Sequence, residues 1–194
     1  ELTISTENLK GIESMSNLRH LTLRSNGADL TPLAALPNLE ALDLSLYGAS
    51  VDLDILARLP RLTELRLPEE AYGQVPTVLS MPSLAFMPDL VSLSINAPQK
   101  ENKTDEEPFD WTLLASLPKL QRLRIVDLGA YQTKAQADAV LKIVADLSAL
   151  KELTLENCDP NLNFTPLNAL TGLDVLAFRQ FNNDVGDLSG LLQV

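Results

Sequence analysis

The stretch from residue 29 to residue 45 reads Asp-Leu-Thr-Pro-Leu-Ala-Ala-Leu-Pro-Asn-Leu-Glu-Ala-Leu-Asp-Leu-Ser and contains two different leucine spacings. Its first half places leucines at steps of three residues from Leu30 to Leu36, which suits a single helical turn. Its second half places Leu42 and Leu44 two residues apart with polar neighbours, which is typical of a strand with one buried face. The stretch therefore predicts a short helical turn followed by a short strand.

Both spacings return along the whole chain, once per unit of 21 to 30 residues. The strand triplets are Leu18/Leu21/Leu23, Leu39/Leu42/Leu44, Leu62/Leu65/Leu67, Leu90/Leu93/Ile95, Leu120/Leu123/Ile125, Leu150/Leu153/Leu155 and Leu173/Leu176/Phe178. The helical-turn triplets are Leu9/Ile12/Met15, Leu30/Leu33/Leu36, Leu53/Leu56/Leu59, Met81/Leu84/Met87, Trp111/Leu114/Leu117, Leu141/Val144/Leu147, Phe164/Leu167/Leu170 and Leu188/Leu191/Val194. Every position is apolar, so each unit depends on its neighbours for burial and the units must stack into one continuous core.

Strands that recur once per unit in the same direction have to stack in parallel, with the return segments on the other side of the sheet. We therefore predict an α/β solenoid in which residues 1–194 form a single domain, with about seven strand units and a partial first unit at Leu2 and Ile4. The chain begins inside a unit and stops where the next strand triplet should begin. We expect it to be a segment of a longer protein.

The return segments differ in kind. The Thr-Pro pairs at residues 31–32 and 165–166 predict a helix N-cap followed by proline at the first helical position, each opening a single helical or 3₁₀ turn. The fifth unit is longer and predicts a true α-helix from about residue 133 to 147, because Thr133 and Gln136 have the spacing of a capping box.

Composition and charge exclude several classes of protein. The chain has 15 Lys and Arg against 26 Asp and Glu, a formal net charge of −11, which argues against nucleic acid or an anionic membrane surface as the partner. An apolar content of 45% excludes a disordered chain, and no apolar run is long enough for a membrane span. Cys158 is the only cysteine, so an internal disulfide and a cysteine-built zinc site are excluded.

The strand triplets and the stretch at residues 29–45 resemble leucine-rich repeat proteins, in particular the short-unit bacterial kind found in internalins and in the repeat domains of bacterial NOD-like NACHT-type NTPases. The resemblance implies a right-handed curved solenoid with a parallel sheet on its concave face and mixed helices and loops on its convex face. It also implies that the concave face binds another macromolecule.

One position departs from this family. The strand motif usually ends in an asparagine that bonds the turn backbone, and here only Asn26 occupies that position. The other units carry Tyr47, Glu70, Pro98, Leu128, Cys158 and Phe181. We therefore expect other groups to satisfy the turns, and we expect Cys158 to be a buried thiol that packs in place of the asparagine.

The sequence offers little for catalysis. His20 is the only histidine, so a Ser-His, Cys-His or multi-histidine metal site cannot be assembled from this chain alone. The eight glycines are scattered and form no phosphate-binding loop, and the acidic pairs at residues 69–70 and 106–107 fall in expected loops. We predict no catalytic residue, no metal and no cofactor, and hence no enzyme within this chain.

Alternate strand residues point away from the core, so the exposed rows of the sheet can be predicted. The rows are His20, Ala41, Glu64, Ser92, Arg122, Glu152, Val175; then Thr22, Asp43, Arg66, Ser94, Arg124, Thr154, Ala177; then Arg24, Ser45, Pro68, Asn96, Val126, Glu156, Arg179. Neighbours in a row predict the ion pairs Asp43–Arg66, Arg122–Glu152 and Glu156–Arg179. These are either ordinary cross-strand pairs or a mixed-charge binding surface, on which Arg122 and Arg124 would be the least-paired positive groups.

The longest insertions follow the strands of three consecutive units, on one rim of the solenoid, at residues 68–80, 96–110 and 126–140. Insertions in repeat arrays commonly map to the binding side, although plain growth of tolerated loops is the alternative. Together with the arginines of the adjoining strands, this rim gives the candidate partner-binding residues. They are Arg66, Tyr72, Lys100, Lys103, Phe109, Arg122, Arg124 and Tyr131.

These observations predict a protein-binding recognition module whose partner contacts the concave face and the loop rim. We favour a ligand- or partner-sensing domain of a larger cytosolic bacterial protein, in which other domains of the same chain are a further possible partner. The alternatives are a secreted, internalin-like adhesin and the substrate-recognition domain of an effector enzyme. No membrane insertion is expected.

Overall fold

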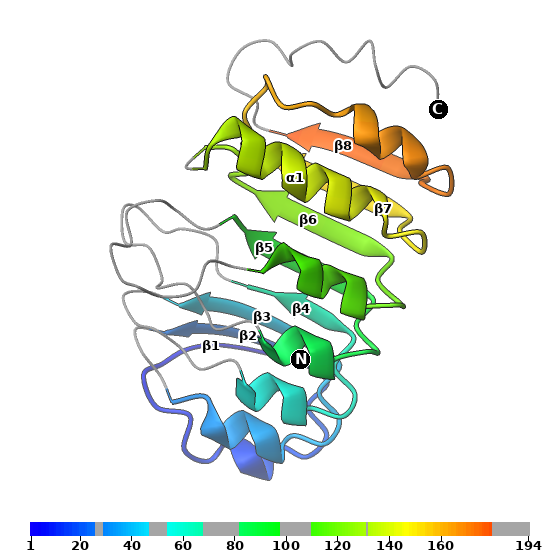
Figure 1. Cartoon of the computed structure of the whole chain (residues 1–194). Helices are drawn as coiled ribbons and strands as arrows, with labels where there is room; N and C mark the ends of the chain where they lie inside the picture. Colours follow the sequence, from blue (N-terminus) through cyan, green and yellow to red (C-terminus); the bar gives the residue numbers. More distant parts are fainter. Residues whose placement is uncertain (26–28, 47–53, 68–81, 98–109, 131, 180–194) are drawn as a thin grey trace.

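The computed structural model describes residues 1–25, 29–46, 54–67, 82–97, 110–130 and 132–179. Its strands form one parallel sheet in which the spatial order is the order along the chain (Figure 1). The strands are β1 (Leu2–Ser5), β2 (His20–Ser25), β3 (Ala41–Leu46), β4 (Glu64–Arg66), β5 (Ser92–Asn96), β6 (Arg122–Val126), β7 (Glu152–Glu156) and β8 (Val175–Arg179). The predicted solenoid of stacked parallel strands is confirmed.

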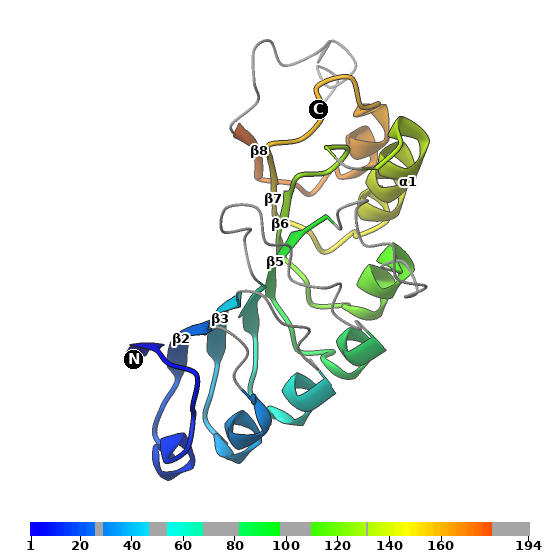
Figure 2. The ribbon, with the colours of Figure 1, turned by 90° about the vertical axis from the view of Figure 1, so that its left-hand side faces the viewer.

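The return segments cover one face of this sheet. They contain the 3₁₀ helices η1 (Ile12–Ser14), η2 (Thr31–Ala35), η3 (Asp54–Arg58), η4 (Pro82–Phe86), η5 (Trp111–Ser116) and η6 (Thr165–Ala169), and the α-helix α1 (Lys134–Ala145). Figure 2 shows the stack bent into an arc, with the strands on its inner, concave side and the helices on its outer, convex side.

The strand phase follows the leucine alternation. On β2, Leu21 and Leu23 are buried while His20 and Arg24 are exposed. Equivalent leucines stand side by side in neighbouring strands, as in the register Leu21 to Leu42 and then Leu65. Because each buried leucine packs against the same residue of the unit before and after it, the leucines form one continuous core between the sheet and the helices.

The short return segments are 3₁₀ rather than α because each has room for little more than one turn. In η2, the Leu33 amide donates to the Leu30 carbonyl and the Leu36 amide donates to the Leu33 carbonyl, which is the i to i+3 pattern. Both bonds bring leucines of the three-residue spacing onto the core side, where Leu33 and Leu36 are fully buried. The spacing of three in the sequence is thus the period of this helix.

The N-cap prediction for the two Thr-Pro pairs is wrong. Leu30 and Phe164 hold the cap positions, and Thr31 and Thr165 are already the first helical residues. The amide of each threonine donates instead to a side chain two residues earlier, Asp29 Oδ1 at 2.9 Å for Thr31 and an asparagine Oδ1 at 3.1 Å for Thr165. The short polar side chain before the turn satisfies the amide, so no hydroxyl cap is needed.

The helix predicted in the fifth unit is confirmed. Thr133 is its N-cap and forms a complete capping box with Gln136. The helix buries Ala137, Val140 and Val144 against the core, beside η5 and η6. The long return segment can therefore close a full α-helix where the shorter ones close only a 3₁₀ turn.

Burial weakens toward the outermost described units. Leu2 and Ile4 on β1 are only partly buried, and so are Leu176 and Phe178 on β8. Met15, which the repeat pattern assigns to the core, is 43% exposed because η1 has a neighbouring helix on one side only in the described part of the chain. The central units by contrast bury their strand leucines almost completely.

The turns after β6 and β7 show what replaces the missing asparagines. Leu128 and Cys158 occupy those positions and are buried, as predicted for Cys158. The turn amides are satisfied by backbone carbonyls of the next unit, because the Asp127 amide donates to Glu156 and the Asn157 amide donates to Arg179. The asparagine positions 26, 47, 70, 98 and 181 lie outside the described residues.

Candidate functional site

The concave face carries the candidate site. The strand register brings the predicted rows together, as in the series His20, Ala41, Glu64, Ser92, Arg122, Glu152 and Val175. A groove of about 490 Å³ runs across them from β2 to β8. Its polar lining comes mainly from His20, Thr22, Asp43, Glu64, Arg66, Ser92, Ser94, Arg122, Arg124, Glu152, Thr154 and Arg179.

The predicted pair between Asp43 and Arg66 is confirmed. Arg66 Nη1 on β4 lies 3.7 Å from Asp43 Oδ2 on β3, and the two residues are direct neighbours in the register. Both side chains keep substantial contact with solvent, so the pair is worth only a fraction of a kcal/mol, of the order of 0.2–1. It orients the Arg66 guanidinium more than it stabilises the fold.

Arg122 pairs with Glu64 and not with the predicted Glu152. Its Nη2 lies 2.7 Å from Glu64 Oε1, two strands away across β5. The residue between them in the row is Ser92, whose small side chain leaves the space above β5 open. A long arginine can therefore cross one strand to reach a carboxylate, a possibility that nearest-neighbour reasoning overlooks.

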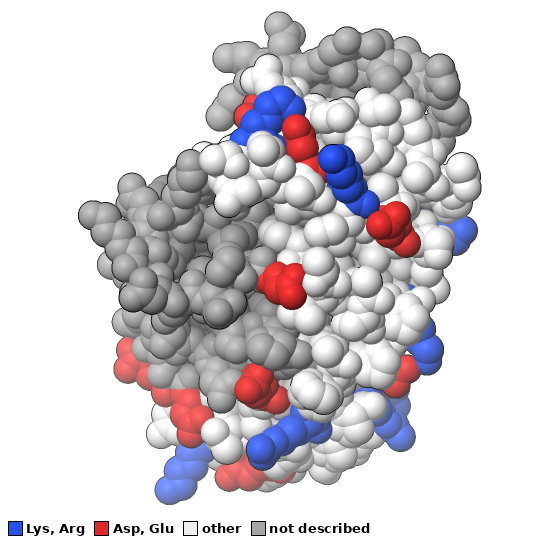
Figure 3. Space-filling model, in the orientation of Figure 1, with Lys and Arg blue, Asp and Glu red and all other residues white. Residues whose placement is uncertain are grey.

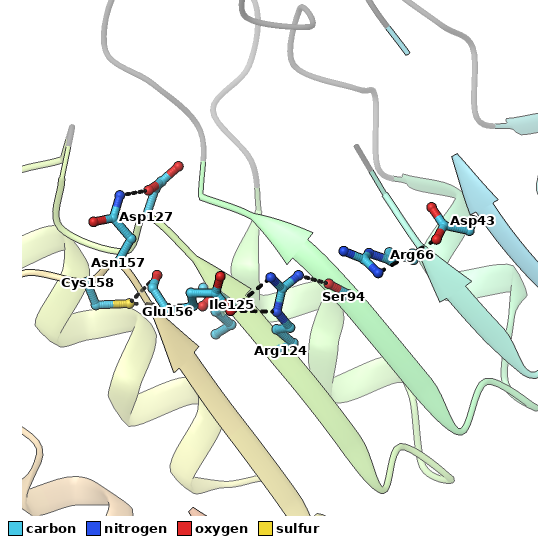
Figure 4. A network of polar contacts seen from close by, with 9 residues as sticks. All are labelled: Asp43, Arg66, Ser94, Arg124, Ile125, Asp127, Glu156, Asn157 and Cys158. Atoms are coloured by element: carbon cyan, nitrogen blue, oxygen red, sulfur yellow. Dashed lines mark hydrogen bonds and ion pairs between the residues drawn. The ribbon is translucent and has the colours of Figure 1, made fainter. Parts of the chain in front are cut away.

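Arg124 is the centre of a partly buried network (Figure 4). Its Nε and Nη2 donate to Glu156 Oε2 at 3.1 and 2.9 Å, and its Nη1 donates to Ser94 Oγ at 3.1 Å. The side chains of Arg124 and Glu156 are 22% and 11% exposed. The predicted partner of Glu156, Arg179, is thus replaced by a residue diagonal to it on β6, which can lie flat over the sheet.

These contacts overturn the expectation that Arg122 and Arg124 are the least-paired positive groups. Arg122 holds a carboxylate of β4, and Arg124 holds a carboxylate of β7 and a hydroxyl of β5. Sequence reasoning also missed Ser92 and Ser94 as parts of the site. The sequence signal that could have identified them is their size: Ser92 and Ser94 are small side chains in two rows where the neighbouring strands carry long charged side chains.

A second polar cluster lies where β6 and β7 end. Asp127 and Asn157 both have positive φ values, of 61° and 50°, and Asn157 Nδ2 donates to Asp127 Oδ1. Cys158 Sγ lies 3.3 Å from the Glu156 carbonyl oxygen. Burial raises the pKa of the Cys158 thiol from 9.0 to about 12, so this thiol is neutral and packed rather than nucleophilic.

The loop rim cannot be placed from the described residues. Tyr72, Lys100, Lys103, Phe109 and Tyr131 all lie outside them. The last seven residues of the third predicted insertion, 134–140, belong to α1, which packs on the convex side and not on the rim. Figure 3 shows lysines and aspartates alternating along this helix, and Lys134 Nζ lies 2.7 Å from Asp138 Oδ2.

The described residues contain no group of three or more His, Cys, Asp and Glu side chains that could hold a metal ion. His20 stands alone and exposed on the concave face, as predicted. Within the same residues, no helix is both long and apolar enough to cross a membrane. The arrangement on the concave face is instead an open, polar surface of both charges.

Comparison with known proteins supports the fold alone. No family model and no curated protein matches this chain. Among solved structures, the chain is similar to internalin C2 from Listeria monocytogenes, with 22% identity, 97% of this chain and 75% of that chain covered, and a TM-score of 0.56. It also aligns with an internalin, InlF, of the same organism, with 21% identity, 93% and 59% coverage and a TM-score of 0.47. The similarity to internalin C2 identifies a leucine-rich repeat solenoid.

Proposed function

We propose that this chain is a protein-binding recognition module whose concave sheet receives the partner. The observation that carries the proposal is the groove, which crosses the strands from β2 to β8 and is lined by side chains of both charges. Strands lie about 4.8 Å apart, so seven strands present a surface about 29 Å long. That length suits a protein surface better than a small molecule.

The charge pattern also favours a protein partner. Positive and negative side chains both line the groove, and acidic residues outnumber basic ones in the whole chain. A polyanion such as nucleic acid requires a continuous basic surface, whereas a folded protein offers charges of both signs. The rim residues Tyr72, Lys100, Lys103, Phe109 and Tyr131 are proposed to extend this surface beyond the sheet.

Site-specific photocrosslinking tests the proposal. A benzophenone side chain is placed at Thr154 on the concave face, or at Ala115, an exposed residue of η5 on the convex face. We expect the Thr154 probe to give a crosslinked product in extracts of the source cells that excess unlabelled wild-type chain suppresses, and we expect none from Ala115. Equal crosslinking from both positions, or crosslinking from Ala115 alone, would contradict a concave binding surface.

The finer role is a proposal about the parent protein. We favour a sensing domain of a larger cytosolic bacterial protein, with a secreted internalin-like adhesin and the recognition domain of an effector enzyme as alternatives. In each case this chain binds and any chemistry is carried elsewhere. The full-length sequence separates them, because a phosphate-binding loop before residue 1 indicates the sensor and a signal peptide indicates the adhesin.

A further inference from the structure

The centre of the groove has a floor and walls of different chemistry. Ser92 and Ser94 of β5 form the floor, since their small side chains face the concave side. Arg66 on β4 and Arg124 on β6 are the direct register neighbours of Ser94 on either side. Arg122 reaches over Ser92 from β6 to Glu64. The two serine hydroxyls therefore lie between arginines of the two neighbouring strands, and Arg124 donates to one of them, Ser94 Oγ.

The charge of the concave face differs from that of the rest of the chain. Its three rows on β2 to β8 contain five arginines and four acidic residues, a formal charge of +1, which leaves −12 for all other positions. None of the seven lysines falls in these rows. The charged residues of the rows are Arg24, Arg66, Arg122, Arg124, Arg179, Asp43, Glu64, Glu152 and Glu156.

The sign of the charge changes along the groove. Across β4, β5 and β6 the rows carry three arginines and Glu64, a net charge of +2. On one side β3 contributes only Asp43, and on the other side β7 contributes Glu152 and Glu156. The groove therefore has a positive centre flanked by acidic side chains on β3 and β7, with the positive Arg179 on β8 beyond them.

Two of the central arginines can contact a ligand. The side chains of Arg66 and Arg122 are 47% and 41% exposed, although each is oriented by a carboxylate. Arg124 is mostly covered and is fixed by Glu156 and Ser94. An arginine presents five N–H donors on a planar group, so the solvent-exposed guanidinium groups of Arg66 and Arg122 can donate to an acceptor on a ligand.

We propose that the centre of the groove binds an acidic side chain of the protein partner, flanked by basic side chains that face Asp43 on β3 and Glu152 on β7. The partner carboxylate lies over Ser94, between the guanidinium groups of Arg66 and Arg122. Charge-assisted hydrogen bonds to arginine are among the strongest in proteins, and buried arginine contacts are frequent binding hot spots. This inference rests on the proposed function and specifies the partner's chemistry.

An extended polyanion fits less well. The −12 charge of the surrounding chain repels a run of negative charges, while it attracts basic groups on either side of a single acid. Two strand spacings from β5 to β3 or β7 are about 9.6 Å, and three residues of an extended peptide span about 10 Å. The complementary spacing is therefore an acid with a base three residues before and three residues after it.

Titration followed by NMR tests this directly with the peptide Lys-Gly-Gly-Glu-Gly-Gly-Lys, blocked at both ends. We expect the peptide to shift the amides of Leu93 to Ile95, and we expect at least fivefold weaker binding when its Glu is replaced by Gln. The charge-reversed peptide Glu-Gly-Gly-Lys-Gly-Gly-Glu should bind more weakly still. Inorganic phosphate at equal ionic strength should not displace the first peptide.

Matched variants locate the binding. Ser94→Glu fills the proposed position with the chain's own carboxylate, and Ser5→Glu makes the same chemical change on the exposed side of β1. We expect Ser94→Glu to weaken the Glu peptide at least fivefold and Ser5→Glu to leave it unchanged. If Ser94→Glu does not fold, Arg122→Gln in the same titration should give the same loss.

Four results would overturn the inference: no binding of the Glu peptide, equal binding of its Gln analogue, stronger binding of the reversed peptide, or displacement by phosphate. If any of these results occurs while excess wild-type chain still suppresses crosslinking at Thr154, the concave face remains a protein-binding surface. It then recognises its partner by a different chemistry. Loss of crosslinking as well would overturn the proposed function together with the inference.

Discussion

Leu93 and Ser92 are neighbours on β5 that face opposite sides of the sheet. Leu93 is 1% exposed in the leucine core, whereas Ser92 faces the concave groove. Leu93→Asp places an uncompensated charge in the core and should cost about 3–5 kcal/mol of unfolding free energy, while Ser92→Asp should cost less than about 1 kcal/mol. Urea denaturation of the two variants measures both values. Equal losses would mean that the strand phase is wrong.

The Cys158 thiol gives a pH dependence with a definite sign. Burial raises its pKa from 9.0 to about 12, so the folded state holds the proton at a pH where the unfolded state releases it. The stability from this thiol is complete below pH 9 and is lost as the pH rises from 9 toward 12. Between pH 8 and pH 10 we expect the wild type to lose about 1 kcal/mol more than Cys158→Ala. Urea midpoints at the two pH values test this, and parallel losses in both proteins would refute it.

At the scale of single residues, the sequence predicts the polar side chains that line the groove but not all of their partners. The prediction that Val126 and Glu156 are exposed is wrong, because both are buried at the ends of their strands. Alternation in the strand determines the face, so the exposed position of Arg122 follows from the pattern alone. Its ion pair depends on the length of the side chain and on the small Ser92 beside it. Such a contact spans 58 residues of sequence and two strands, and no local rule specifies it.

Among the elements, two threonines at helix starts test the capping assignments. Thr133 accepts from the Gln136 amide in a complete capping box, while Thr165 is a first helical residue whose amide bonds to Asn163. We expect Thr133→Ala to cost about 1 kcal/mol and Thr165→Ala to cost a few tenths at most. Thermal unfolding of both variants gives the comparison. A larger loss for Thr165→Ala would restore the N-cap reading that the structure contradicts.

The helices α1 and η6 show which features of a helix can be predicted from the sequence. The α1 helix was predictable because it begins with a capping box and its apolar positions repeat at helical spacing over about three turns. The 3₁₀ turns have only one period, and there the polar residue two positions earlier competes with threonine for the amide. The placement of α1 on the convex side follows from its packing between η5 and η6, which a sequence insertion does not specify.

For the whole molecule, repetition made the fold predictable. Every unit repeats the same two apolar spacings, so the stack, the parallel sheet and the two faces follow from any one unit. The candidate binding site does not follow from the repeat in this way. The positive centre of the groove arises from Arg66, Arg122 and Arg124, which break the repeat and differ from the equivalent residues of other units.

The central claim is that the partner binds the concave face of the solenoid. The most direct measurement is the affinity of the partner captured at Thr154 for two double variants of equal charge change. Arg66→Ala with Arg122→Ala alters the groove, and Lys134→Ala with Lys142→Ala alters the convex helix. Isothermal titration calorimetry, with melting temperatures as the check on folding, gives both dissociation constants.

We expect the arginine variant to bind at least about tenfold more weakly, since each hot-spot arginine is worth about 1–2 kcal/mol, with little change in its melting temperature. The lysine variant should bind like the wild type. The opposite result, normal binding by the arginine variant and lost binding by the lysine variant, would place the site on the convex face and contradict the account.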